Sequence, residues 1–548
     1  MTETAAPLLE IKGLTVALPD GADRDFAVEK IDYTLNPDEI LCIVGESGSG
    51  KSVTAHAIMG LLPKPDLRIA AGGILYRGRN IVTMSDAEQR KLRGHRIAMI
   101  FPEPMTALTP LMRIGAQIEE ALSIHTDIDR TARTARVVEM LAAVGLPNPE
   151  EIRKSYPFRL SGGQRQRVMI AMALALKPDI LIADEPTTAL DVTTQKQILD
   201  LIKEIQREQR MAVLFITHDF GVVAEIADRV AVMRHGRVVE IGAAAEVLNR
   251  PQHPYTRELI GSLPHGRADD GPKFVPEGDP LIAATDVHKV YRIAGTRVGG
   301  ARTLVVSDHV HLTIHPGETV GLVGESGSGK STLARTIVGL VKPDGGRVDF
   351  EGADLLSLDR DAFRPYRRHV QMVFQDPYAS LNPRHKVGEI IAQGPVAFGM
   401  DKAEARARAR DLLALVGLDA SAADRYPHEF SGGQRQRVSI ARALAMEPKL
   451  LIADEPVSAL DASVQAQVLD LLAEIKAKLN LAMLFITHDL RIAAQICDTV
   501  GVMKLGKIVE IGPAAEVFGH PKDAYTKSLL EAIPGQGWTP PATRAGGS

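Results

Sequence analysis

The sequence GESGSGKS occurs twice in this chain, at Gly45–Ser52 and again at Gly324–Ser331. Each copy is followed by SGGQRQR, LIADEP and FITHD in the same order. SGGQRQR begins 23 residues before the aspartate of LIADEP in both copies, and the glutamate of LIADEP lies 33 residues before the histidine of FITHD in both. A repeat of about 270 residues is a duplicated domain, because solenoid repeats run roughly 20 to 50 residues. The chain is therefore predicted to carry two nucleotide sites on one polypeptide.

Length and composition agree with this division. The 548 residues exceed what one hydrophobic core usually organises. A hydrophobic content of 45% with 24% charged residues is ordinary for a globular protein, and the net charge of −4 gives no basic field that would favour nucleic acid as a partner. The N-terminus lacks a secretory pattern, and no apolar run reaches about 18 residues. We expect a cytoplasmic protein without nucleic acid as its partner.

The boundary between the copies is predicted from composition. Residues 261–280 are rich in Gly, Pro and charge and show no apolar period, which is typical of an exposed linker. The tail from Gly535 has the same character and is expected to be mobile. We therefore predict a first domain with a C-terminal extension at 1–264, a linker at 265–280, a second such domain at 281–534 and a tail at 535–548.

The chain contains two cysteines, Cys42 and Cys497. Two isolated thiols cannot build a four-cysteine zinc or iron–sulfur site. Each lies in an apolar segment, so we expect both to be buried core residues.

The repeated octapeptide is predicted to bind a polyphosphate. In the first copy an apolar strand at Ile40–Val44 precedes it, and a helix is expected to begin near Lys51. Glycines let backbone N–H groups converge on phosphates, the helix N-terminus favours negative charge, the lysine reaches the phosphates and the serine ligates Mg²⁺. The predicted nucleotide-binding residues of the two loops are Gly45, Ser47, Gly48, Gly50, Lys51 and Ser52, and Gly324, Ser326, Gly327, Gly329, Lys330 and Ser331.

LIADEP is predicted to be a buried strand that ends in two carboxylates. Asp184 and Asp454 are expected to hold Mg²⁺ through its water shell, and Glu185 and Glu455 to polarise the attacking water. Successive side chains of a strand point to opposite faces, so both acids can serve one site only if the chain turns at once. We expect the following prolines to supply that turn. On its own, a pair of carboxylates at the end of an apolar run is at least as typical of a solvated loop as of a binding site.

SGGQRQR precedes an apolar, helix-like run in each copy. Ser161 and Ser431 can cap this helix, and the glycines that follow leave backbone N–H groups open to an anion. One occurrence could be merely a well-capped helix, but two identical occurrences favour a binding role. The predicted nucleotide-binding residues here are Ser161, Gly162, Gly163 and Gln164, and Ser431, Gly432, Gly433 and Gln434.

Taken together these motifs resemble ATP-binding cassette ATPases. The resemblance also rests on LSGGQ and FSGGQ, the ALD motifs at Ala189–Asp191 and Ala459–Asp461, and His218 and His488 after apolar strands. It implies an α/β fold of two tandem P-loop ATPase domains of this cassette type, each a RecA-like core with a helical subdomain. It also implies ATP and Mg²⁺ as cofactors, and His218 and His488 as catalytic residues beside Glu185 and Glu455. Each site would be shared between the copies, because the phosphate loop of one copy would face the SGGQRQR motif of the other.

A narrower resemblance lies past the core of each copy. PQHPYTREL at Pro251–Leu259, PKDAYTKSL at Pro521–Leu529 and DPYASLNP at Asp376–Pro383 look like dipeptide and oligopeptide import ATPases, in their fused form. The family often carries a cysteine-rich iron–sulfur loop here, but this chain has no cysteine there, so we expect no iron–sulfur cluster. The resemblance implies two integral-membrane permease subunits and a solute-binding protein as partners, and a peripheral place on the cytoplasmic face of the inner membrane.

The two copies differ at two functional positions. Gln375, predicted to contact the Mg²⁺ shell, is replaced by Pro102, which offers no side-chain donor or acceptor. The adenine-stacking aromatic of this family aligns with Tyr291 in the second copy and with Leu18 in the first, unless Phe26 substitutes. We predict that the first site hydrolyses ATP at a reduced rate.

Two other functional classes are alternatives to an importer ATPase. A soluble twin-cassette ATPase acting on ribosomes or DNA usually has a long charged linker, zinc cysteines or a long coiled coil, none of which this sequence shows. An exporter ATPase is disfavoured by the import-type extension. The cargo is not encoded in this chain, because peptides, opines, glutathione or nickel chelates would leave the same motifs.

Overall fold

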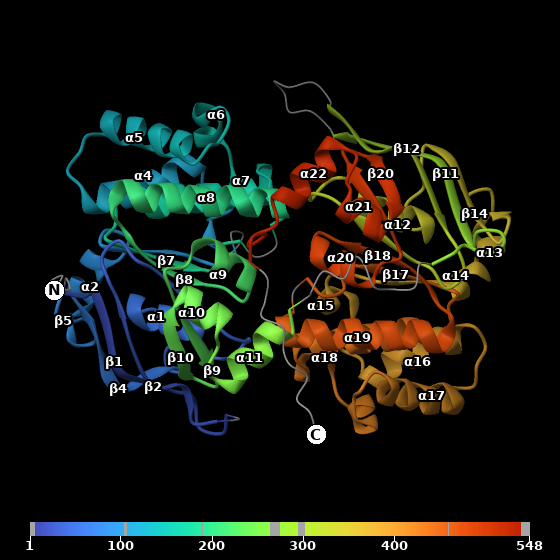
Figure 1. The fold of residues 1–548 in the computed structure, drawn as a ribbon, viewed down its shortest axis with the longest axis horizontal. Coiled ribbons are helices and arrows are strands. Elements are labelled where there is room, and N and C mark those ends of the chain that lie inside the picture. Colours follow the sequence, from blue (N-terminus) through green and yellow to red (C-terminus); the bar gives the residue numbers. More distant parts are fainter. Residues whose placement is uncertain are drawn as a thin grey trace. The chain divides into compact units, whose positions relative to one another are not determined.

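The computed structural model describes residues 6–22, 24–103, 107–187, 190–263, 274–293, 302–458 and 460–538. They divide into two compact units. The first unit holds the described residues within 1–190, 194–263 and 534–548. The second unit holds residues 191–193 and the described residues within 264–533 (Figure 1). Part of the predicted linker and of the predicted tail falls outside the described residues, and the predicted domain boundaries stay a prediction.

The core of the first unit is a six-stranded sheet with the order β10-β9-β3-β8-β7-β6. β3, β7 and β8 consist of five buried residues each, the pattern of parallel strands that are covered on both faces. Neighbours pair in parallel except β9 and β10, which are antiparallel. The bounds are β3 (Ile40–Val44), β6 (Ile97–Ile100), β7 (Ile180–Asp184), β8 (Ala212–Ile216), β9 (Arg229–Arg234) and β10 (Arg237–Ala243).

Two different layers cover this sheet. Leu41 and Ile43 of β3 pack with an antiparallel sheet of order β2-β1-β4-β5, whereas Cys42 and Val44 pack with the helical region. In Figure 1 the strands β1, β2 and β4 lie at one end of this unit and α4, α5 and α6 at the other. The antiparallel strands are β1 (Leu9–Ala17), β2 (Phe26–Leu35), β4 (Arg68–Tyr76) and β5 (Arg79–Asn80).

Among the helices of the first unit, the one predicted after the phosphate loop begins at Lys51, as expected. Their bounds are α1 (Lys51–Met59), α2 (Asp86–Leu92), α4 (Ile114–His125), α5 (Arg130–Ala143), α6 (Pro149–Lys154), α7 (Gly162–Leu174), α8 (Val192–Gln209), α9 (Phe220–Ile226), α10 (Ala244–Asn249) and α11 (Pro254–Gly261), with short 3₁₀ turns at Ile81–Thr83 and Pro157–Arg159.

The second unit repeats this plan. Its central sheet has the order β16-β17-β18-β13-β19-β20 and its antiparallel sheet the order β12-β11-β14-β15. The strands are β11 (Ile282–Ile293), β12 (Arg302–Ile314), β13 (Thr319–Val323), β14 (Gly345–Phe350), β15 (Ala353–Asp354), β16 (Val370–Val373), β17 (Leu450–Asp454), β18 (Ala482–Thr487), β19 (Thr499–Lys504) and β20 (Lys507–Pro513). The helices are α12 (Lys330–Ile337), α13 (Arg360–Phe363), α14 (Tyr366–His369), α15 (Pro377–Ser380), α16 (Val387–Ala397), α17 (Lys402–Leu415), α18 (Gly432–Leu444), α19 (Ala462–Leu479), α20 (Leu490–Ile496), α21 (Ala514–Gly519) and α22 (Ala524–Glu531), with 3₁₀ turns at Ala420–Asp424 and Pro427–Glu429.

Both cysteines are buried, as predicted. Cys42 lies in β3 and Cys497 directly follows α20, each within a hydrophobic core. Burial raises the pKa of both thiols, so neither is ionised at neutral pH. Across the described part of the chain, no helix combines the length and apolar character needed to cross a membrane.

Candidate functional site

The predicted phosphate-loop, LIADEP and FITHD residues of each copy gather at one edge of the central sheet. In the first unit β3, β7 and β8 run parallel and end in the phosphate loop, in Asp184 and Glu185, and in the segment before His218. Ligands of open α/β sheets bind at the carboxyl ends of the strands. The same edge of the second unit carries the matching residues after β13, β17 and β18.

Glycine is required at two positions of each loop for different reasons. Gly50 precedes α1 in the left-handed conformation (φ 101°), and a Cβ there would lie 2.7 Å from the carbonyl oxygen of Ala27. At Gly45 a Cβ would collide with the backbone oxygen of Met233. Gly324 and Gly329 repeat both restrictions in the second unit. These contacts hold the loop close to the sheet, so its shape exists before any ligand binds.

The loop lysine and serine are held alike in both units. Lys51 is buried, and its Nζ donates to the carbonyl oxygens of Gly45 (2.7 Å) and Glu46 (2.9 Å). Lys330 does the same with Gly324 and Glu325, at 2.7 and 2.8 Å. A buried ammonium at the mouth of a loop of N–H groups is suited to the phosphates of a nucleotide.

The loop serine and the strand-end aspartate are hydrogen-bonded to each other in each unit. Ser52 Oγ donates to Asp184 Oδ1 at 3.0 Å, and Ser331 Oγ donates to Asp454 Oδ1 at 2.9 Å. Asp184 Oδ2 is buried and has no hydrogen-bond partner among the described residues. A buried carboxylate oxygen of this kind beside a hydroxyl fits Mg²⁺, which binds proteins through few oxygen ligands and keeps several waters.

Burial raises the pKa of Asp184 to about 6, with a smaller contribution from the charge of Glu185, and the Ser52 hydrogen bond opposes the shift. Burial likewise raises the pKa of Asp454. A protonated carboxyl cannot help to hold a cation, so cation binding at this site should weaken in acid.

We expect Mg²⁺-dependent nucleotide binding at the first site to be about tenfold weaker at pH 5 than at pH 8, because one unit below its pKa Asp184 is roughly one-tenth ionised. A fluorescent ATP analogue titrated against Lys330→Ala protein, whose second site is silenced, measures it. Asp184→Asn in the same background controls for protonation of the nucleotide itself. A pH profile unchanged by this substitution would contradict the expectation.

The turn that brings the two carboxylates to one site is made by the glutamate itself. Glu185 and Glu455 adopt the left-handed conformation, with φ 46° and 48°, which is uncommon for residues other than glycine. The N–H of Glu185 still donates to the Ile216 oxygen at 2.9 Å, so the sheet continues up to this residue. The prediction that the following proline supplies the turn is therefore wrong in its detail: the reversal precedes the proline. Strain of this kind is typical of functional positions.

In the second unit two side chains hold the Glu455 carboxylate. Gln375 Nε2 donates to Glu455 Oε2 at 2.9 Å, and His488 Nδ1 lies 3.3 Å from the same oxygen. Burial opposes both charges, but the mutual hydrogen bond and attraction raise the pKa of His488 and lower that of Glu455. Glu455 is therefore held as a carboxylate that can accept a proton, the state that a general base needs.

The first unit has the glutamate and the histidine but not the glutamine. His218 Nδ1 lies 3.4 Å from Glu185 Oε1. Pro102 stands two residues after β6, as Gln375 does after β16, and is exposed. The hydrogen bond that Gln375 donates thus has no counterpart from this position, because proline has no polar side-chain atom.

The residues expected beside adenine also differ. Tyr291 is 41% exposed at the end of β11, with Lys289 Nζ 5.4 Å from the centre of its ring. Leu18 is half-buried. In the first unit Phe26 lines a pocket of about 950 Å³ together with Arg24, whose Nη2 donates to the oxygen of Gly48 at 2.5 Å. Phe26 thus shares a pocket with a side chain that contacts the phosphate loop of the first unit.

The serines of the two SGGQRQR motifs cap the helices that follow them. Ser161 Oγ accepts from the N–H of Gln164, whose Oε1 accepts from the N–H of Ser161, and Ser431 and Gln434 form the same capping box. The second glycine has another role that the sequence did not reveal. A Cβ on Gly163 would lie 2.8 Å from Thr194 Cγ2, so this glycine lets the helix start approach α8. Ala189 and Ala459 of the ALD motifs lie outside the described residues.

Two tyrosines of the C-terminal extensions contact the phosphate loops, and sequence reasoning missed them. Tyr255 of α11 accepts a hydrogen bond from the N–H of Glu46 at 3.4 Å, and Tyr525 of α22 accepts one from the N–H of Glu325 at 3.2 Å. Both rings are buried, and a cation from β9 or β19 lies 4.4 Å from each ring centre. The signal was present, since PYT and AYT occupy the same place in the two extensions.

We expect Tyr525→Phe to destabilise the second unit, because it removes the acceptor of a partly buried N–H, a loss worth about 1–3 kcal/mol. In a domain of this size each kcal/mol lowers Tm by roughly 2–4 °C. Scanning calorimetry measures the change, and Tyr378→Phe, at an exposed ring, is the control that should melt like the unmodified protein. An unchanged melting profile for Tyr525→Phe would show that the contact carries no stability.

Comparison with known proteins agrees with this geometry. The family model described as ABC transporter matches residues 28–188 and 307–458. The chain belongs to the ABC transporter family. The model described as Oligopeptide/dipeptide transporter, C-terminal region, matches residues 239–283 and 509–543, which include both buried tyrosines. The predicted fold class of two tandem ATP-binding cassettes is confirmed, and its cassettes are ATP-hydrolysing domains.

Two curated relatives match nearly the whole chain. The chain is 47% identical over 539 residues to the peptidoglycan transport ATP-binding protein YejF of Agrobacterium fabrum, covering 97% of both proteins. It is 45% identical over 558 residues to the glutathione import ATP-binding protein GsiA of Salmonella typhimurium, covering 96% of this chain and 89% of that protein. Among solved structures, a dimeric ATP-binding cassette with bound ADP and phosphate is 28% identical over 43% of this chain and 98% of its own, with a TM-score of 0.39.

Proposed function

We propose that this protein is the energy-coupling subunit of an importer for peptides or similar small solutes. It hydrolyses ATP and thereby drives two integral-membrane permease subunits, from a peripheral position on the cytoplasmic face of the inner membrane, and a solute-binding protein delivers the cargo. The observation that carries the proposal is the presence of two phosphate sites, each joined to an import-type extension through a buried tyrosine. The full-length relatives named for peptidoglycan transport and glutathione import support it.

The site residues receive the following roles in this proposal. Lys51 and Lys330 bind the phosphates of ATP, while the serine and aspartate pairs, with Gln375 at the second site, hold Mg²⁺. Glu185 and Glu455 polarise the attacking water, and His218 and His488 contact the γ-phosphate. Phe26 takes the place of Tyr291 against adenine in the first cassette.

We place the permease contacts on the helical region of each cassette. Exposed apolar side chains there support this: Leu111 is 86% exposed and Phe158 56% in the first unit, and Tyr378, three residues after Gln375, is 64% exposed in the second. Exposed apolar groups of this size, one of them three residues from Gln375, are suited to a partner that senses the nucleotide.

Affinity purification of the tagged chain from gently solubilised native membranes tests the proposal. We expect two polytopic membrane proteins to co-purify, as identified by mass spectrometry. Leu111→Asp should reduce their recovery, whereas Leu340→Asp, at an apolar residue 62% exposed elsewhere on the second unit, should not. Recovery of the chain with ribosomal or DNA-bound partners instead would overturn the importer and leave the ATPase chemistry.

A further inference from the structure

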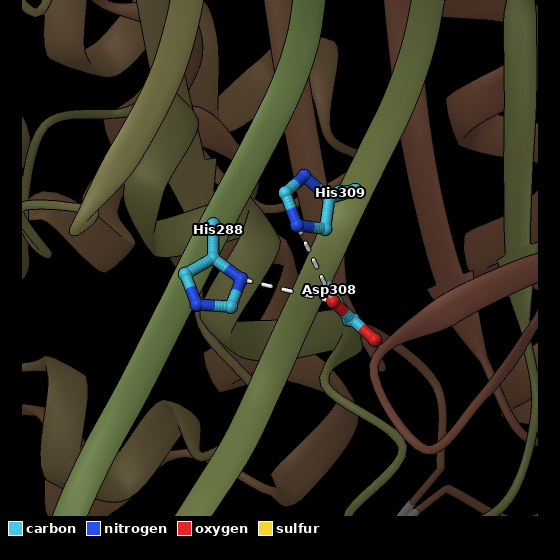
Figure 2. Close-up of side chains that lie close together, drawn as sticks. All are labelled: His288, Asp308 and His309. Carbon is cyan, nitrogen blue, oxygen red and sulfur yellow. Dashed lines mark ion pairs between the residues drawn. The ribbon is translucent and has the colours of Figure 1, made fainter.

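Two histidines and an aspartate converge on the antiparallel sheet of the second unit. His288 lies on β11, and Asp308 and His309 are consecutive on the neighbouring strand β12 (Figure 2). His288 Nδ1 and His309 Nε2 each lie 3.8 Å from Asp308 Oδ1, and one ligand atom from each residue lies within 4.8 Å of the others. We propose that these three side chains bind one divalent transition-metal ion of the zinc class.

The backbone is shaped to bring these groups together. Consecutive residues of a regular strand point to opposite faces, so Asp308 and His309 would normally diverge. His309 adopts the left-handed conformation, with φ 53°, and the pairing of β11 with β12 shifts its register between Val287 and Lys289. A bulge of this kind re-aims a side chain. In Figure 2 both imidazole rings accordingly lie beside Asp308.

Neighbouring charges leave one ligand atom of Asp308 and of His309 available. Asp286 Oδ1 lies 2.6 Å from His309 Nδ1, so the carboxylate fixes the tautomer whose Nε2 lone pair can bind a metal. Lys507 Nζ lies 3.2 Å from Asp308 Oδ2, which leaves Oδ1 towards the histidines. A carboxylate behind a histidine is the arrangement that supports metal-ligating imidazoles in proteins.

His288 supplies an observation that points independently to a ligand. Its Nδ1 is buried and has no hydrogen-bond partner in the described part of the chain, since the 3.8 Å to Asp308 exceeds hydrogen-bond distance. A polar atom left in this state is costly unless another group satisfies it. A metal ion between the two rings and Asp308 Oδ1 would do so.

The donor set selects the class of ion. Zinc binds imidazole nitrogen and carboxylate oxygen at about 2.0–2.2 Å in tetrahedral geometry, which places neighbouring ligand atoms about 3.3 Å apart. The two 3.8 Å distances to Asp308 need a closure of about half an ångström, and the two imidazole nitrogens, which lie within 4.8 Å of each other, need one of at most about 1.5 Å. Two imidazoles favour Zn²⁺, Co²⁺, Ni²⁺ or Cu²⁺ over Mg²⁺ and Ca²⁺, which prefer oxygen alone. Three protein ligands leave the fourth position to water.

The first cassette has the same backbone without these ligands. Strand pairing places Thr15, Glu29 and Lys30 where the second cassette has His288, Asp308 and His309. Lys30 has φ 47°, close to that of His309. Gly13, with φ 55°, occupies the place of Asp286, with φ 56°. The bulge therefore forms without a metal, and the metal site is a property of the second cassette. There it ties β11 to β12 just before Tyr291.

The residues of the first cassette give matched variants for the test. Full-length protein is titrated with Co²⁺ without nucleotide or Mg²⁺, and tetrahedral Co²⁺ is followed by its visible absorption, with Zn²⁺ competition giving the affinity. We expect one equivalent of tetrahedral Co²⁺ in the unmodified protein and its loss in His288→Thr/His309→Lys. Asp286→Gly should retain the site with about 10- to 100-fold weaker binding. His385→Gln, which removes an exposed histidine elsewhere in the unit, should bind as the unmodified protein does.

The residues that these variants introduce occur at the same backbone positions in the first cassette, so we expect the variants to fold. Circular dichroism and nucleotide binding check this. Equal Co²⁺ stoichiometry and affinity in the unmodified protein and in folded His288→Thr/His309→Lys would overturn the proposal. So would the absence of tetrahedral Co²⁺ from the unmodified protein at micromolar protein and metal. Either result would identify the three residues as a surface ion-pair cluster.

Discussion

Glu455→Gln is expected to lower turnover at the second site by about 10²- to 10⁴-fold, the range that a positioned general base contributes, so that the first site supplies the ATPase rate that remains in the assembled transporter. The substitution keeps the size of the side chain and removes its charge. The partners of the carboxylate, Gln375 and His488, stay in place. Phosphate release from the transporter purified with its permeases measures the rate. A fluorescent ATP analogue should still bind, because the phosphate loop is untouched.

Glu185→Gln is the matched variant of the first cassette and should cost less. Its carboxylate has His218 nearby, but Pro102 cannot donate the hydrogen bond that Gln375 gives to Glu455. If the second site carries most of the turnover, removing the base of the first leaves most of the rate. Equal losses from Glu185→Gln and Glu455→Gln would show that the two sites work alike, and the predicted asymmetry would be wrong.

The motifs predicted much of each site because they stand at the ends of strands. Five-residue apolar runs such as ILCIV that end at a glycine-rich turn are typical of buried strands with both faces covered, and parallel strands deliver their carboxyl ends to one edge. Lys51, Asp184 and His218 therefore come together although they are far apart in sequence. Two copies with equal spacing favoured this interpretation of the motifs over a chance match, since each copy is a control for the other.

What the sequence did not predict depends on tertiary packing. The turn at Glu185 was assigned to the proline after it, because propensity gives no reason to expect a glutamate at φ 46°. The surrounding sheet and loop impose that conformation. Tyr255 appeared as part of a family motif, and only the fold brings α11 to the phosphate loop. The His288 cluster depends on a bulge that no sequence pattern revealed.

Exchanging the residues at the glutamine position should move activity between the sites. Gln375→Pro removes a hydrogen bond to a charged group, worth about 1.5–3 kcal/mol, and should lower the ATPase rate roughly ten- to a hundredfold. The reverse change, Pro102→Gln, restores a donor two residues after β6, where Gln375 stands after β16. It should therefore raise the rate of the first site.

The ATPase rate of the first site can be measured alone when the second site is inactivated. In a Glu455→Gln background the remaining ATPase rate reports the first cassette, and adding Pro102→Gln should raise it about tenfold or more if the missing bond limits it. A third substitution, Glu185→Gln, should then abolish the gain, since a glutamine at position 102 can act only through a working base. A rate that Pro102→Gln leaves unchanged would mean that the first site is limited elsewhere, with adenine contact at Leu18 and Phe26 the next position to exchange.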